Sequence, residues 1–146
     1  MIKKTITFED LDGNEVKKDL YFHISKIEGI KKKESEFVQL GEMGKDLERK
    51  QKRLQKLAQE RGDAEPSDDP FSEENTLLRI SAKSMVDVLD MLIDLSYGER
   101  SEDGMSFIRE KKAEEFRESL AYEAFIFQMM SNPEEITEFV NSLLNK

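Results

Sequence analysis

The chain has 146 residues and a formal net charge of −9, with 37% hydrophobic and 38% charged residues. This length suits one domain, and the small apolar share favours a modest core with long solvated helices. The negative charge disfavours nucleic-acid binding. The lack of cysteine excludes disulfide and thiol chemistry. The sequence shows no secretory signal and no apolar run long enough to cross a bilayer, so we expect a cytoplasmic protein that does not bind a membrane.

Residues 1–24 predict a β-hairpin. The segment Leu11-Asp12-Gly13-Asn14 supplies an Asp-Gly turn between two runs whose apolar residues share one parity. These residues are Ile2, Ile6 and Phe8 before the turn, and Val16, Leu20, Phe22 and Ile24 after it. An isolated hairpin is only marginally stable in water, so its apolar face must pack on helices or on another subunit.

Residues 25–61 predict helices. Ser25 and Glu28 form a capping box, which predicts a helix from Lys26 onward. We expect Gly41 and Gly44 to weaken or bend this helix, because glycine disfavours helical conformation.

A second, basic helix is predicted over residues 45–61, with a thin stripe of leucines at positions 47, 54 and 57. Residues 62–74 then predict an acidic linker with two prolines. The basic helix and the acidic segment either fold back on each other or form a solvated helix and a disordered loop. We prefer the second interpretation because it needs fewer assumptions.

Residues 75–146 form the helical part. Ser84 is placed to cap a helix over residues 85–96 that ends near Gly98, and residues 113–130 predict a helix that breaks near Ser119.

The last helix has the clearest signal. Asn132 is placed to cap it, Pro133 to open it, and acidic residues fill its first turn. Its apolar positions follow the i, i+3, i+4, i+7, i+8 pattern of an amphipathic helix. These positions are Ile136, Phe139, Val140, Leu143 and Leu144. The elements together predict a single α+β domain, mostly α, in which an N-terminal β-hairpin precedes a helical bundle.

Few residues suggest chemistry. His23 is the only histidine, and no second group at a recognisable spacing accompanies it, so we expect no catalytic residue. Asp87, Asp90 and Asp94 share one helix stripe, which could hold a divalent cation. An exposed polar stripe on a buried helix is the simpler interpretation.

The only basic cluster lies on the helix over residues 45–61, and it supports an alternative function. A small acidic regulatory or nucleic-acid-associated protein could use this helix. No aromatic residue is interleaved for base stacking, and acids dilute the charge, so a solvated helix explains the cluster better. Its cations are Lys45, Arg49, Lys50, Lys52, Arg53, Lys56 and Arg61.

Two segments carry more apolar residues than one buried face needs: residues 85–95 and residues 125–130. A helix that is apolar nearly all round lies in the centre of a bundle or at an interface. Methionine and phenylalanine together form an adaptable surface for hydrophobic partners. A core and a partner surface are equally compatible with the pattern. The residues predicted to contact a partner are Met85, Leu89, Leu92, Phe125, Met129 and Met130.

A family resemblance rests on several stretches in one order. They are KKTITFEDLDGNE at residues 3–15, LYFHISK at 20–26, SYGERSEDG at 96–104 with Phe107-Ile108, then Glu115-Phe116, Tyr122, Phe125 and ITEFVN at 136–141. In this order they resemble the tail assembly chaperones of long-tailed bacteriophages and of prophages in Gram-positive bacteria. The resemblance covers about residues 1–30 and 84–146. Residues 31–83 depart from the family pattern and look like an insertion or a lineage-specific elaboration, so the helices predicted over residues 25–61 are expected to be lineage-specific.

The resemblance implies a protein that is no enzyme and needs no cofactor or metal. Such chaperones coat the hydrophobic, helical tape measure protein until tail tube protein displaces them, and they are absent from the finished particle. Many also exist in a longer, frameshifted form. We therefore expect a host cytoplasmic protein whose partners are the tape measure protein and the tail tube (major tail) protein. The hairpin edge and the extra apolar helix surface also favour self-association.

Overall fold

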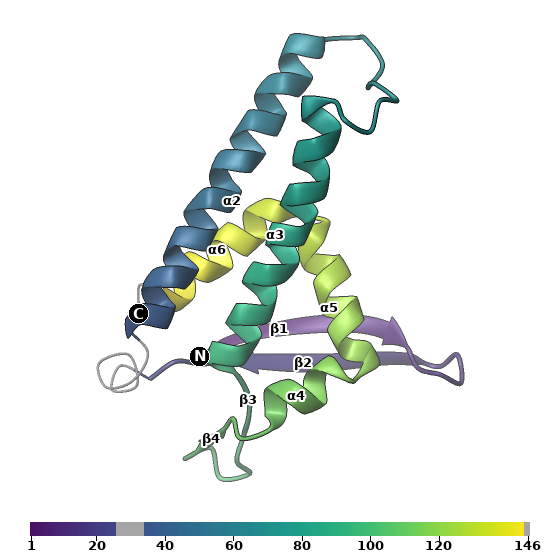
Figure 1. The fold of residues 1–146 in the computed structure, drawn as a ribbon. Helices are drawn as coiled ribbons and strands as arrows, with labels where there is room; N and C mark the ends of the chain where they lie inside the picture. Colours follow the sequence, from purple (N-terminus) through teal and green to yellow (C-terminus); the bar gives the residue numbers. More distant parts are fainter. Residues whose placement is uncertain (26–33, 145–146) are drawn as a thin grey trace.

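The computed structural model describes residues 1–25 and 34–144 (Figure 1). The N-terminal antiparallel hairpin precedes a mostly helical chain, which confirms the predicted α+β class. The helix predicted from Lys26 begins outside the described residues. The elements are β1 Ile2–Glu9, β2 Glu15–Phe22, α2 Glu34–Arg61, α3 Glu73–Ser96, β3 Tyr97–Arg100, β4 Phe107–Ile108, α4 Lys112–Arg117, α5 Leu120–Met130 and α6 Pro133–Leu144.

The turn of the β-hairpin forms as its Asp-Gly pair predicts. The Gly13 N–H donates to the Asp10 carbonyl at 3.1 Å, and the Asp10 N–H donates to the Asn14 carbonyl at 2.9 Å. Gly13 has φ +82°, a left-handed conformation that glycine adopts without strain. The Asp10 carboxylate accepts from the backbone N–H groups of Asp12 and Asn14, which stabilises the loop further.

The hairpin is extended by two short strands into an antiparallel sheet of order β1-β2-β3-β4. Strand β3 follows α3 directly, so that Tyr97 pairs with Phe22 and Gly98 with Tyr21. Gly98 lies so close to β4 that an added Cβ would stand 2.5 Å from the Ile108 carbonyl oxygen. The turn that carries the family resemblance therefore joins the C-terminal end of α3 to the edge of the sheet.

The core lies between the hairpin and the helices. Phe22 is its centre: its ring centroid lies 5.7 Å from that of Tyr97, 5.5 Å from that of Phe125 and 4.9 Å from that of Phe139. Helix α5 packs on β1 and crosses the hairpin, and α6 packs along α2 (Figure 1). Aromatic pairs in these geometries stabilise the core beyond the area that they bury.

Helix α2 runs unbroken from Glu34 to Arg61 through Gly41 and Gly44. The prediction of a separate helix over residues 45–61 is therefore wrong, because these residues continue α2. Gly44 is buried where α2 meets α6, and a Cβ there would lie 3.3 Å from the Val140 Cγ1. The glycine thus permits close approach of the two helices. The packing energy of this contact outweighs the weak helical propensity of one residue.

Helix α3 begins at Glu73 rather than near Met85, so the prediction that Ser84 caps it is wrong. Ser72 is the N-cap, and its hydroxyl accepts from the Asn75 N–H. Ser84 lies in the middle of the helix, where its Oγ accepts a hydrogen bond from the Lys50 Nζ at 2.9 Å. Helices α2 and α3 lie side by side and form an arm that projects from the sheet (Figure 1).

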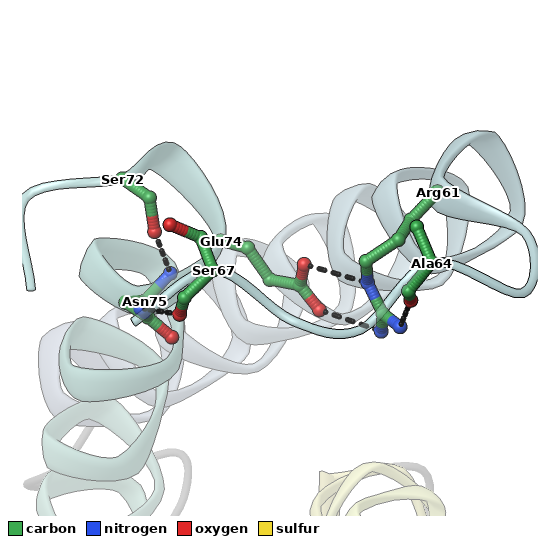
Figure 2. A network of polar contacts seen from close by, with 6 residues as sticks. All are labelled: Arg61, Ala64, Ser67, Ser72, Glu74 and Asn75. Atoms are coloured by element: carbon green, nitrogen blue, oxygen red, sulfur yellow. Dashed lines mark hydrogen bonds and ion pairs between the residues drawn. The ribbon is translucent and has the colours of Figure 1, made fainter. Parts of the chain in front are cut away.

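The loop between α2 and α3 is held by a polar network (Figure 2). The Arg61 guanidinium donates to both carboxylate oxygens of Glu74, at 3.2 and 3.1 Å, and to the Ala64 carbonyl at 2.9 Å. The Asn75 side chain donates to the Ser67 carbonyl at 2.8 Å. The basic helix therefore folds back on the acidic segment, and the preferred interpretation as a disordered loop is wrong.

The C-terminal helices follow the sequence pattern. Helices α4 and α5 are separated at Ser119, and α6 begins at Pro133, as predicted. Four of the apolar positions of α6 are buried: Ile136, Phe139, Val140 and Leu143. In the described part of the chain, no helix combines the length and the hydropathy that crossing a membrane requires.

Candidate partner-binding surface

Five of the six residues predicted to contact a partner are buried, and the sixth, Met130, is half-buried against the same core. The buried five are Met85, Leu89, Leu92, Phe125 and Met129. They correspond to the other interpretation of the pattern, a core built from the apolar helices. A partner would reach them only if α3 and α5 separated, so their contact with a partner stays a prediction.

Helix α5 is apolar on two opposite sides. One side, formed by Ala121, Phe125 and Met129 at i, i+4 and i+8, is buried on the sheet and the other helices. The opposite side presents Leu120 and Phe127, which are 39% and 63% exposed. Sequence reasoning treated residues 125–130 as one dense segment and missed this division.

Other exposed apolar side chains lie in loops, or on α2 (Val38) and α3 (Leu78 and Ile80). Leu11 is 90% exposed at the turn of the β-hairpin, and Phe71 and Met105 are exposed in the α2–α3 and β3–β4 loops. The loop residues come from separate segments of the chain, and Leu78 and Ile80 are two positions apart, so they do not share a helix face. Among the described helices, α5 is therefore the one whose large exposed apolar residues are spaced to meet another helix.

The aspartate stripe of α3 is neutralised by α4 and α5. The Arg117 guanidinium pairs with Asp94 and lies 3.9 Å from the Asp90 carboxylate. The Tyr122 hydroxyl donates to Asp90 at 2.6 Å. Burial and this hydrogen bond raise the pKa of Tyr122 to about 12. These contacts attach α4 and α5 to α3, which favours a structural role for two of the three aspartates.

No group of three or more His, Asp or Glu side chains within residues 1–25 and 34–144 could hold a metal ion. His23 is half-buried rather than exposed, and its ring packs edge-on against Phe107 with centroids 5.6 Å apart. Its backbone N–H donates to the Ser96 carbonyl at 2.8 Å. His23 therefore contacts the region where α3, the hairpin and β4 meet.

Much of the basic charge of α2 is already paired. Lys52 forms a salt bridge with Glu48 at 3.3 Å, and Arg53 forms one with Glu73 at 2.8 Å. Lys50 bonds Asp46 at 2.7 Å as well as Ser84. With Arg61 held by Glu74, four of the seven cations have carboxylate partners among the described residues. This pairing lowers the attraction that the helix can offer to a phosphate backbone.

Comparison with known proteins identifies one family. A family model described as phage tail assembly chaperone matches residues 1–146, the whole of the chain. The match includes residues 31–83, which the resemblance of the sequence did not cover. No curated protein and no solved structure matches the chain.

Proposed function

We propose that this chain, which belongs to the family of phage tail assembly chaperones, binds hydrophobic helical segments of the tape measure protein. It keeps that protein in solution in the host cytoplasm and helps to recruit tail tube protein, which then displaces it. The chaperone is absent from the mature virion. It acts by covering a surface rather than by catalysing a reaction.

The observation that carries this proposal is the presence of exposed apolar side chains on a body with a formal net charge of −9. Apolar contacts supply affinity for an apolar partner. Electrostatic repulsion between the negatively charged complexes then opposes their aggregation. Both properties are what a protein needs to hold an aggregation-prone partner in solution.

Self-association forms part of the proposal. Strand β1 pairs with β2 on one side, and no strand among the described residues pairs with its other side. An unpaired edge offers backbone hydrogen bonds to a second copy. Light scattering over a series of protein concentrations should show a rise in mean mass. A constant monomer mass would remove self-association from the proposal.

Co-expression tests the function. The tape measure protein of the same genome is expressed alone, with this chain, or with an unrelated acidic helical protein as control. We expect it to stay in the supernatant and co-purify only with this chain, and to be released when tail tube protein is added. The proposal fails if the tape measure protein is equally soluble alone or never co-purifies.

A further inference from the structure

Helix α5 presents a second apolar face that no residue of 1–25 or 34–144 covers fully. Leu120, Ala124 and Phe127 lie at i, i+4 and i+7, opposite the buried face of Phe125 and Met129. Ala124 is half-buried and packs against the core, so the exposed apolar surface of this face comes from Leu120 and Phe127. Such spacing is the geometry by which one helix packs against another.

We infer that this outer face of α5, formed by Leu120, Ala124 and Phe127, is the docking surface for the apolar stripe of a basic amphipathic helix. The inference rests on the proposed function, because it names the place where the chaperone holds its partner. The three residues span two helical turns, so each copy of the chain would hold about two turns of the partner helix.

Charge argues for a basic partner. Glu123 is the only charged residue of α5, and Glu118 precedes the helix; both are exposed. Neither makes an ion pair with another residue in the described ranges. Both cations of α4 are engaged, because Arg117 pairs with Asp94 and Lys112 lies 3.3 Å from Glu99. The unpaired charges on α5 and just before it, Glu123 and Glu118, are therefore negative, and a helix with lysine or arginine beside its apolar stripe complements them.

Size argues against a second copy as the main occupant. Phe127 and Leu120 together expose roughly 200 Å² of apolar surface, on the usual areas of such side chains. A stable protein–protein interface buries about 800 Å² on each partner. A second copy would also bring a second negative face to the first. One short helical segment of opposite charge fits the area and the charge better.

Peptide binding tests the inference directly. The probe is a labelled synthetic amphipathic peptide with leucines on one face and lysines on the other, measured by fluorescence anisotropy. A second peptide has glutamates in place of the lysines. We expect the lysine peptide to bind and the glutamate peptide to bind at least tenfold more weakly. Equal binding of both peptides would refute the charge argument.

Substitutions then locate the site. Phe127→Glu should weaken binding of the lysine peptide about tenfold or more, because the charge replaces a large apolar contact. Phe127→Leu should largely keep it. Ile80→Glu is the matched control, since Ile80 is a large apolar residue of another helix, α3, and is 45% exposed. Thermal unfolding of each variant checks that the fold is intact. Equal loss in Ile80→Glu would overturn the location.

The same variants with the tape measure protein separate this inference from the proposed function. If the wild-type chain fails to bind the tape measure protein, the proposed function fails. If wild type and Phe127→Glu both bind it equally, the function stands and the α5 surface is wrong. If Phe127→Glu instead abolishes only self-association in light scattering, the face belongs to a second copy and the inference is overturned.

Discussion

Substitution Gly98→Ala should detach the short strand β4 from the sheet. The added Cβ would lie 2.5 Å from the Ile108 carbonyl oxygen, 2.8 Å from a Phe107 ring carbon and 2.9 Å from the Arg109 Cγ. The side chains of Phe107 and Arg109 can rotate away. The Ile108 oxygen belongs to the backbone, so β4 itself must move.

The cost follows from what holds β4. The strand has two residues and pairs with β3 through Ile108 opposite Glu99 and Phe107 opposite Arg100. Arg109, which follows it, donates to the Leu95 carbonyl at 2.6 Å. Losing two or three hydrogen bonds at about 1 kcal/mol each lowers the free energy of unfolding by ~2 kcal/mol. For a chain of this size that corresponds to a Tm about 4–8 °C lower.

Gly44→Ala is the matched control, because it also adds a methyl group to a buried glycine. Its nearest neighbour is the Val140 side chain at 3.3 Å, which can shift slightly. Alanine gains up to about 1 kcal/mol of helical propensity over glycine, which offsets this crowding. We expect its free energy of unfolding to stay within about 0.5 kcal/mol of the wild-type value.

Urea unfolding followed by circular dichroism measures both variants. The reasoning is refuted if Gly98→Ala unfolds at the wild-type midpoint, or if Gly44→Ala loses as much stability as Gly98→Ala. The second result would mean that any added methyl group is costly in this fold, whether it meets backbone or side chain.

Three further predictions concern stability. Phe125→Ala should cost ~3–5 kcal/mol in the free energy of unfolding, because it removes a buried ring; binding lost without such destabilisation would mean that Phe125 contacts a partner. A double-mutant cycle of Arg61→Gln and Glu74→Gln should give a coupling of about 0.5–1 kcal/mol that falls with added salt, and zero coupling would mean that the pair does not hold the loop. Burial raises the pKa of Tyr97 and of Tyr122 from 10.0 to about 12. As the pH rises, the unfolded chain therefore loses these protons before the folded chain does. The contribution of the two tyrosines to the free energy of unfolding is complete below pH 10 and should be lost as the pH rises through 12. Substituting both tyrosines by phenylalanine should flatten this part of a urea-midpoint profile, and an unchanged alkaline slope would contradict the assignment.

The polar contacts of the arm show why its sequence was misread. Ser84 looked like a helix cap because no local pattern reveals that Lys50, far away in the sequence, donates a hydrogen bond to it. The acidic segment over residues 62–74 looked like a disordered linker. Its C-terminal end is held by Arg61 of α2, whose guanidinium donates to Glu74 in the first turn of α3. Contacts between distant segments decided both cases.

Local pattern was sufficient where it allowed one solution. The hairpin followed from period-two alternation around Asp12 and Gly13, because a one-residue slip in register would put Ile6 on the opposite side of the sheet from Leu20 and Phe22. The last helix followed from its 3.6-residue apolar period and from Pro133 at its first turn. In both elements, burial of one face and the backbone preference of the residues agree.

Where the local pattern allowed two structures, only the packing of the elements against one another determined which one formed. Helix α5 has apolar residues on opposite sides, so its periodicity cannot say which side is inside. Contact with β1 buries Phe125 and leaves Phe127 in solvent. Gly44 could have weakened its helix or allowed another helix to pack closely against it. The close contact with Val140 of α6 corresponds to the second outcome. The reason is the same in both cases: burial is a property of the assembled layers, which no single segment contains.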